Sequence, residues 1–284
     1  MTINGSIPTP PLDLSIVVSS FGRIDESKAL VESIDDEFGS ISYELIFVTS
    51  DPIDSEKNSW LSRQRNVVLL AIGDRRPGEK RQKSLYYYEN LGCNAARGNW
   101  ILCINDDMRV LPGTRAAFIE QSNSDFAALA VPAHIGSQSL GLRVPLMGRL
   151  RISGVSLPLL LLDFAFMKKA AFLDLGGYDE GLDWYGKGID ISIRLLLNSM
   201  KVGVLEKAGL GHTLAQEGRT PPHPSTDFRY LNKKWNHLRS GNEWSLELFN
   251  PPRQWMPRWL AQGIWPSYQR IKVQVSSIIA GTSK

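Results

Sequence analysis

The chain has 284 residues, of which 43% are hydrophobic and 21% charged, and its formal net charge at pH 7 is +3. This composition is typical of a globular domain with a sizeable core, and the small net charge gives no reason to expect a nucleic-acid partner. The longest apolar run, Val155 to Met167, is interrupted by Pro158 and Asp163 and is too short to span a bilayer of about 30 Å.

The two cysteines, Cys93 and Cys103, lie inside apolar segments and not at disulfide or metal-binding spacings. We therefore expect two buried thiols in a reducing, cytoplasmic compartment. Residues 1–11 contain three prolines and no apolar run behind a basic start. We therefore expect no secretory signal in this segment and a flexible N-terminal arm.

Strand and helix patterns alternate along the chain. The first strand pattern, Leu12 to Val18, is followed by a helical stripe from Glu26 to Phe38. Later strands are expected at Tyr43–Val48, Asn66–Ile72, Trp100–Ile104, Phe126–Val131, Leu159–Met167 and Val202–Leu205, and a hairpin within Leu140–Leu157. This alternation predicts an α/β fold with a mainly parallel central sheet flanked by helices.

The strand from Trp100 to Ile104 runs directly into Asn105, Asp106 and Asp107. Strand tips on a parallel sheet are where ligand crevices form, because the sheet holds their side chains rigidly. Two adjacent acids repel each other unless a positive charge lies between them, which points to a divalent cation. The alternative is that the two acids only open a turn after the strand.

Three further segments carry polar groups. Arg75 to Lys83 holds five cations in nine residues, which suits either contact with phosphate or an ordinary solvated surface. The loop from Tyr178 to Gly188 is rich in acids and glycines and predicts a surface that faces a substrate. In the helix predicted from Ile189 to Met200, Asp190 lies four residues before Arg194, the spacing of an intrahelical ion pair.

Five blocks, taken in order, resemble the family 2 glycosyltransferases of GT-A fold. The blocks are Ser15–Arg23, Asn90–Ile101, Asn105–Asp107, Gly176–Glu180 and Ile189–Arg194. The resemblance implies a GT-A (Rossmann-like) domain at 12–235, with a nucleotide-sugar half at 12–112 and an acceptor half at 113–235. A Trp- and Arg-rich extension occupies 236–284.

The same resemblance implies a metal-dependent, inverting transfer of a sugar from a nucleotide-diphosphate sugar to a saccharide or lipid-linked acceptor, in polysaccharide synthesis. Mn²⁺ or Mg²⁺ would be bound by Asp107, the last acid of the DxD motif, and by His212. The acceptor side would include Asp179, Glu180 and Trp184. The donor would contact Ser19, Ser20, Phe21, Arg23, Ser50, Lys83, Asn90, Asn105 and Asp106.

The chain departs from the family at two places. Thr49–Ser50 stands where the family has an Asp pair that binds the nucleotide base, and Lys187–Gly188 stands where it has a Glu-Asp pair. The Asp of that second pair is the catalytic base, and inverting transfer needs such a carboxylate. Asp183 or Asp190 would have to replace it, and the sequence does not choose between them.

The departures leave a catalytically silent nucleotide- or carbohydrate-binding protein as the alternative. A nucleotidyltransferase would require a glycine-rich loop after the first strand, where this chain has one glycine, Gly22. Tryptophan and arginine in 236–284 suit either peripheral contact with the inner face of the cell membrane or packing onto the catalytic domain. The sequence leaves both open.

Overall fold

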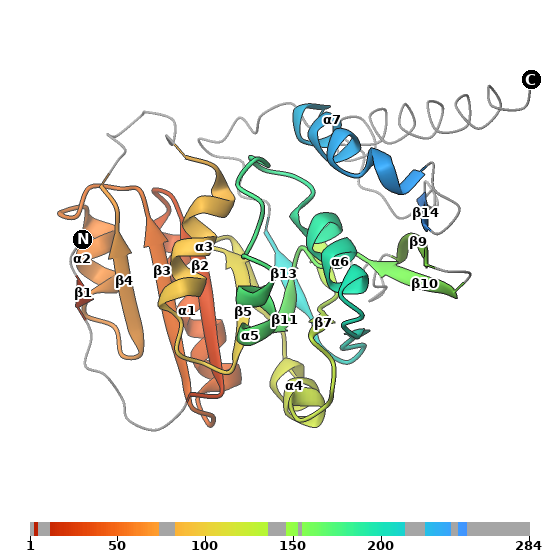
Figure 1. Cartoon of the computed structure of the whole chain (residues 1–284). Coiled ribbons are helices and arrows are strands. Elements are labelled where there is room, and N and C mark those ends of the chain that lie inside the picture. Colours follow the sequence, from red (N-terminus) through yellow and green to blue (C-terminus); the bar gives the residue numbers. More distant parts are fainter. Residues whose placement is uncertain are drawn as a thin grey trace, which may run out of the picture.

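The computed structural model describes residues 3–4, 12–73, 83–135, 146–152, 155–213, 225–239 and 244–248. A central sheet has the strand order β1-β4-β3-β2-β5-β11-β7-β12 (Figure 1). Its strands are β1 (Ile3–Asn4), β2 (Leu14–Ser20), β3 (Tyr43–Thr49), β4 (Val67–Ala71), β5 (Trp100–Asn105), β7 (Ala128–Ala130), β11 (Ala165–Lys168) and β12 (Val202–Val204). Strands β4, β3, β2 and β5 are parallel, whereas β11 runs antiparallel to both β5 and β7. The predicted α/β fold with a mixed, mainly parallel sheet is confirmed.

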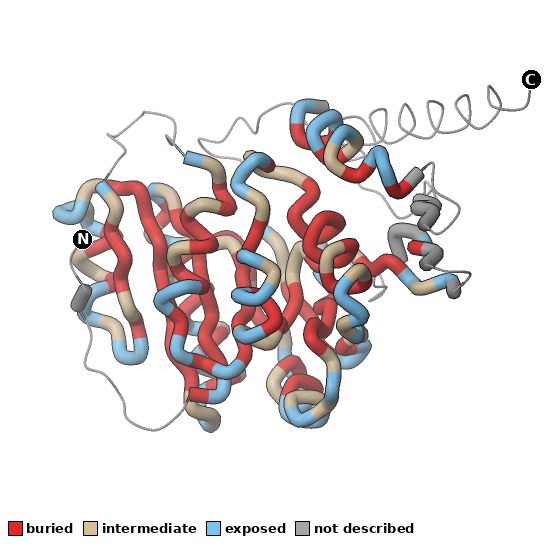
Figure 2. The backbone as a smooth tube through the Cα atoms, in the orientation of Figure 1, coloured by how far each residue is buried: buried red, intermediate tan, exposed pale blue. Residues whose placement is uncertain are grey.

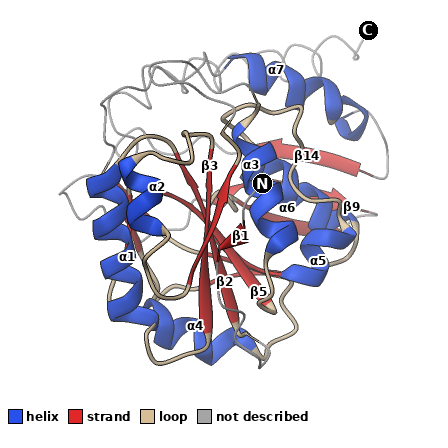
Figure 3. Cartoon of the chain, turned by 90° about the vertical axis from the view of Figure 1, so that its left-hand side faces the viewer, coloured by secondary structure: helices blue, strands red, loops and turns tan. Residues whose placement is uncertain are grey.

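Helices cover both faces of this sheet (Figure 3). One face carries α1 (Ile24–Phe38), α2 (Glu56–Leu61) and α4 (Thr114–Ser122), and the other α3 (Leu85–Ala95), α5 (Lys169–Asp174) and α6 (Lys187–Leu197). Successive side chains of a strand point to opposite faces. Ile16 of β2 therefore packs with Ile34 of α1, while its neighbour Val17 packs in the cluster that holds Tyr88 of α3. Both faces are covered, so the central strands are buried along their length (Figure 2).

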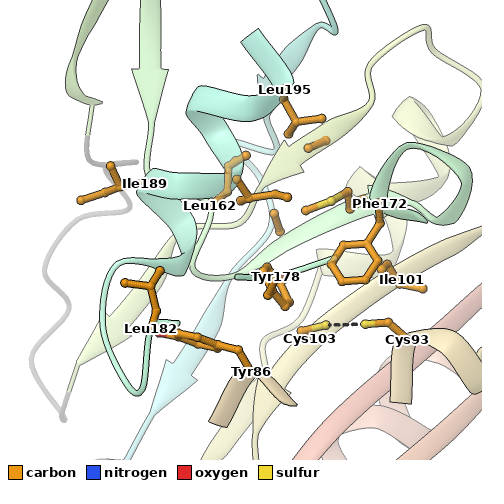
Figure 4. Close-up of a cluster of buried hydrophobic side chains, with 14 of the residues drawn as sticks. Tyr86, Cys93, Ile101, Cys103, Leu162, Phe172, Tyr178, Leu182, Ile189 and Leu195 are labelled. Atoms are coloured by element: carbon orange, nitrogen blue, oxygen red, sulfur yellow. Dashed lines mark hydrogen bonds between the residues drawn. The ribbon is translucent and has the colours of Figure 1, made fainter. Parts of the chain in front are cut away.

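The cluster under α6 contains both cysteines (Figure 4). Cys93 and Cys103 are buried free thiols, as predicted, and their Sγ atoms lie 3.3 Å apart. Tyr86, Tyr178 and Leu162 belong to the same cluster. It joins α3, β5 and α6 into one core.

Two three-stranded sheets flank the central one. The first has the order β6 (Met108–Val110), β13 (Leu210–His212), β8 (Ala133–Ile135), and its register places His212 opposite Met108. The second has the order β10 (Val155–Leu160), β9 (Leu146–Ile152), β14 (Trp244–Leu248), and includes the predicted hairpin. The first of these sheets brings a late segment of the chain beside Asp107.

One predicted strand is wrong. Leu159 to Met167 was expected to be continuous, but β10 ends at Leu160 and β11 begins at Ala165. β10 pairs with β9 in the small sheet, whereas β11 pairs with β5 in the central one. The chain changes sheets within a mainly apolar segment, and the crossing places Asp163 between the two strands.

On each side of the expected domain at 12–235, a short segment beyond its bounds pairs with one of its sheets. Ile3 and Asn4 pair with Leu70 and Leu69 of β4, and the rest of the arm at 1–11 lies outside the described residues, so its flexibility stays a prediction. After α7 (Ser225–Lys234) and the short 3₁₀ helix η1 (Asn236–Arg239), β14 pairs with β9. Thus part of the expected extension joins a sheet of the domain.

The remaining parts of two predicted segments lie outside the described residues. These are the cationic segment up to residue 82 and the extension after residue 248. In the part of the chain that the structure describes, no helix is long and apolar enough to cross a membrane.

Candidate active site

The site lies where the parallel strands β2, β3 and β5 end together. In the sheet register Ser19 pairs with Val48 on one side and Asn105 on the other, so the turns that follow all three strands meet. Carboxyl ends of parallel strands are the usual position of a ligand crevice. Ser20, Ser50 and Asp106 are fully buried at this edge.

Asp106 holds the turn that follows β2. Its Oδ2 accepts hydrogen bonds from Ser20 Oγ at 3.0 Å and from Phe21 N at 3.1 Å, and its Oδ1 accepts one from Arg23 Nη2. The side chain of Asp106 is enclosed by protein, so its contacts serve to fix the turn after β2.

Arg23 connects the two acids of the motif. Its Nη1 donates to Asp107 Oδ2 at 2.8 Å, while Nη2 binds Asp106. Burial would lower the pKa of Arg23, but the two neighbouring carboxylates outweigh it and the pKa is raised. Arg23 thus supplies one of the positive charges that the adjacent acids require.

Asp107 faces His212. His212 Nε2 lies 3.2 Å from Asp107 Oδ1, which accepts no hydrogen bond within the described residues. Burial would raise the pKa of Asp107, but His212 and then Arg23 lower it well below its ordinary value. A buried carboxylate oxygen beside an imidazole nitrogen fits a divalent metal, since both are ordinary metal ligands.

The Asp107–His212 pair is held by the first small sheet. Thr213 N and Thr213 Oγ1 both donate to the carbonyl of Asp107, each at 3.0 Å, and this fixes the end of β13 against the motif. Among the described residues, no three His, Cys, Asp or Glu side chains gather as a metal site. Two protein ligands suit a cation whose other positions are filled by substrate phosphate and water.

An acid that the sequence analysis missed lies at the end of β3. Asp51 Oδ2 accepts hydrogen bonds from Gly22 N and from Lys57 Nζ, both at 2.6 Å, and so connects the turns after β2 and β3. Asp51 directly follows Thr49–Ser50, the two positions at which the resemblance calls for an Asp pair. A comparison restricted to those two positions therefore does not include it. A charged residue directly after a strand was the signal that could have found it.

Two hydroxyls at this edge have no partner in the described structure. Ser19 Oγ and Ser50 Oγ are buried and make no hydrogen bond there. Buried polar atoms are normally satisfied, so these are candidate contacts for a ligand.

Phe21 and Lys83, both expected to contact the donor, lie next to tyrosine rings of α3. The ring of Phe21 packs edge-on against Tyr88, with centroids 5.4 Å apart. Lys83 is exposed just before α3, and its Nζ lies 5.8 Å from the centroid of the Tyr87 ring.

Asn90, expected to bind the donor, points to the acceptor side instead. Its Nδ2 donates to Tyr178 O at 2.9 Å and to Glu180 Oε1 at 3.0 Å, and its Oδ1 accepts from Tyr178 N at 2.8 Å. Gly177 has φ of +78°, and a Cβ there would lie 2.8 Å from Asn90 Oδ1. The amide therefore fixes the Gly-Gly turn and the loop that follows, and its role at the donor stays a prediction.

The loop that carries the expected acceptor residues is fastened by α7. Asp227 accepts from Asp183 N at 2.9 Å with Oδ1, and from Trp184 N at 2.9 Å and Tyr185 N at 2.8 Å with Oδ2. Asp179 accepts from Tyr230 Oη and from Lys234 Nζ of the same helix. Figure 1 shows α7 above this loop.

Asp190, one of the two expected bases, is enclosed. Its Oδ2 accepts from Arg194 Nε at 2.8 Å, the intrahelical pair that the spacing predicted, and its Oδ1 accepts from Trp235 Nε1 at 3.0 Å. Lys234 Nζ lies 2.7 Å from the same Oδ1, and Asp190 is fully buried. Asp190 is therefore engaged on both of its carboxylate oxygens, and the indole of Trp235 packs inside the domain.

Lys187, at the position where the resemblance calls for a Glu-Asp pair, takes part in a buried ion pair. Lys187 Nζ donates to Glu89 Oε1 at 2.7 Å and to Oε2 at 2.8 Å, and lies 5.0 Å from the centroid of the Tyr178 ring. Burial would lower the pKa of Lys187, but Glu89 raises it above the ordinary value. Lys187 therefore connects α6 to α3 inside the protein. The sequence showed the lysine but not its partner.

Comparisons with known proteins show the fold. No protein-family model matches the sequence, and no curated protein matches it. The crystal structure of GalNAc-T7 with UDP, GalNAc and Mn²⁺ is similar, with a TM-score of 0.59 and 14% identity over 79% of this chain and 48% of that one. S. aureus TarS 1–349 in complex with UDP-GlcNAc has a TM-score of 0.59 and 14% identity over 81% of this chain and 68% of that one.

The chain thus spans about half the length of GalNAc-T7 and about two thirds of the TarS fragment. At such low identities the similarity concerns architecture alone. The layered sheet and the order of its strands are those of the GT-A fold, the fold of nucleotide-sugar glycosyltransferases.

Proposed function

We propose that this chain is a metal-dependent, inverting glycosyltransferase of family 2. It transfers a sugar from a nucleotide-diphosphate sugar to a saccharide or lipid-linked acceptor in the synthesis of a cell-envelope polysaccharide. The observation that carries the proposal is the Asp107–His212 pair, a buried carboxylate oxygen 3.2 Å from an imidazole nitrogen at the carboxyl edge of a GT-A sheet.

The donor half of the site fits a nucleoside diphosphate. Asp107 and His212 would hold Mn²⁺ or Mg²⁺, which neutralises the charge of the leaving diphosphate when it is bound. Arg23 adds a buried positive charge beside the acids. The unpartnered hydroxyls of Ser19 and Ser50 offer hydrogen bonds to the nucleoside.

The comparisons suggest which donor to test first. TarS was crystallised with UDP-GlcNAc, and GalNAc-T7 with UDP, GalNAc and Mn²⁺. Uridine diphosphate sugars with Mn²⁺ are therefore the first donors to test. We place the reaction in the cytoplasm, at the inner face of the membrane if the acceptor is lipid-linked.

The test is a panel of nucleotide sugars with Mn²⁺ or Mg²⁺, read by thermal shift and by donor hydrolysis. Asp107→Asn should lower turnover on the order of 10³-fold, because several kcal/mol of charge stabilisation are lost and 1.36 kcal/mol is a factor of ten. Asp174→Asn, on the exposed side of α5, is the matched control. An Asp107→Asn variant that keeps wild-type, metal-dependent turnover would contradict the proposal.

One observation favours the silent-binder alternative. Gly188 has no side chain and Asp190 is enclosed, so neither provides the family's base. Metal-dependent binding of nucleotide sugars without any turnover would support that alternative.

A further inference from the structure

We propose that Asp163, in the crossing between β10 and β11, is the general base that takes the proton from the acceptor hydroxyl. This inference rests on the proposed glycosyl transfer. It names a residue for the role of the base, which neither Gly188 nor Asp190 provides. Asp163 was not among the candidates from the sequence, because it interrupts an apolar run outside every motif.

Asp163 differs from the neighbouring carboxylates in its contacts. Asp107 is paired with Arg23, Asp190 with Arg194, and Glu89 with Lys187. In the described part of the chain, Asp163 takes part in no ion pair, and its one hydrogen bond is accepted by Oδ1 from Gly188 N at 3.0 Å. The residue is partly exposed. A carboxylate that has no cation partner and can accept another hydrogen bond fits a general base.

The chain on either side of Asp163 fixes its position. Phe164, the next residue, packs edge-on against the ring of His212, with centroids 6.2 Å apart, and its carbonyl accepts from Val131 N. Leu162, the preceding residue, is fully buried in the cluster beneath α6 (Figure 4). Asp163 therefore stands between the proposed metal ligand and the first turn of α6, where donor and acceptor sides meet.

Gly188 explains why the carboxylate comes from another element. A Cβ built on Gly188 would lie 2.3 Å from Asp163 N and 2.5 Å from Asp163 Oδ1. No side chain fits at 188 without moving the backbone of the crossing. The carboxyl group of Asp163 occupies the volume into which a residue at 188 would project.

The surroundings of Asp163 suit proton transfer. Burial raises the pKa of Asp163, while the charge of Lys187 and the N–H of Gly188 oppose the rise. The titratable groups near it are Lys187 of α6, with its partner Glu89, and Tyr86 of α3. A carboxylate with a raised pKa is a stronger base than an ordinary one.

The step balances as follows. The acceptor O–H bond breaks and its proton passes to the Asp163 carboxylate. The acceptor oxygen forms a bond to the anomeric carbon while the bond from that carbon to the diphosphate oxygen breaks. The nucleoside diphosphate leaves with the electron pair.

The simplest structural role for Asp163 is to cap α6, whose N-cap Gly186 provides no side-chain acceptor. Asp163→Asn separates the two roles, because the amide oxygen can still accept from Gly188 N but cannot act as a base. With UDP-GlcNAc or another active panel donor and Mn²⁺, the variant should bind UDP as the wild type does and should melt no lower than the wild type. Transfer should fall roughly 10²- to 10⁴-fold.

The pH profile supplies the second measurement. The rise of kcat/KM with pH in the wild type should disappear in Asp163→Asn and return, at lower amplitude, in Asp163→Glu. Asp183→Asn tests the other candidate base from the sequence, and Asp174→Asn is the matched surface control. The inference is overturned if Asp163→Asn transfers sugar at the wild-type rate with the same pH profile, or if Asp183→Asn alone removes the rise. A wild type that neither binds nor turns over any donor would instead refute the proposed function.

Discussion

Two parts of the site are assembled in different ways. The proposed donor edge lies at the ends of β2, β3 and β5, and the proposed acceptor edge comprises the loop from Tyr178 to Gly188 with the helices α3 and α7 that contact it. Donor-edge side chains stand at or just after the ends of hydrogen-bonded strands, as in the Ser20–Asp106 contact between β2 and the β5 turn. Acceptor-edge contacts join helices and loops, as in Asn90 with Tyr178 and Asp227 with the loop at 183–185. Both kinds of contact bridge long stretches of chain, so separation in sequence is not the difference.

The difference lies in what fixes each side chain. Sheet register fixes the position of a strand-end residue once the strands are paired. A motif at a strand end therefore predicts where its side chains lie. A loop residue depends on whichever element packs against it. The proposed donor edge therefore keeps most of the resemblance to the family, apart from Thr49–Ser50, whereas the proposed acceptor edge has Lys187–Gly188 where the resemblance calls for a Glu-Asp pair.

The strongest test of this contrast is Lys187→Met. The change leaves Glu89 buried without its cation, which should destabilise the protein by about 3–5 kcal/mol. Urea unfolding measures it. The double variant Lys187→Met with Glu89→Leu should recover most of the loss, because replacing both charges by apolar groups is often nearly neutral. A single variant within about 1 kcal/mol of wild type would show that the pair does not stabilise the acceptor edge.

A smaller effect is expected from Asp227→Asn. The amide cannot accept from all three N–H groups at 183–185, so one or more lose their partner, at about 1–3 kcal/mol. Hydrogen exchange at these amides should speed up while exchange at β2 and β5 stays unchanged. Glu206→Gln, at an exposed turn, is the control. Equal protection in the variant would mean that α7 does not hold the loop.

The smallest effect is a pH-dependent difference in the free energy of unfolding between wild type and Asp163→Asn. Because the pKa of Asp163 is raised in the folded protein, the folded state binds more protons than the unfolded state between the two pKa values. Stability therefore falls as pH rises through that window. Asp163→Asn should be more stable than wild type at pH 7, and the gain should vanish below the unfolded value of about 3.9.

Melting curves of wild type and Asp163→Asn across pH 3–8 would measure this difference, with Asp174→Asn as reference. A variant less stable than wild type at pH 7 would indicate that the carboxylate serves the fold and not the reaction. This outcome would also weaken the assignment of Asp163 as the base.

The sequence by itself determined the layered α/β fold, and it predicted the strand end at which Asp106 and Asp107 stand. These follow from local patterns: β-branched runs, helical stripes and polar residues at strand ends, each visible within about ten residues. His212 was placed beside Asp107 only through the family resemblance, and β13 supplies the physical reason in its register against β6.

Only the tertiary structure decided which carboxylates are engaged and which is available. Asp190 matched the family by position but is neutralised by Arg194 and Lys234, and Asp163 matched nothing but stands beside Gly188. Whether an acid is paired depends on cations that reach it from other elements, and no local pattern carries that information. The break between β10 and β11 was hidden for the same reason, since an apolar run does not show that its two halves join different sheets.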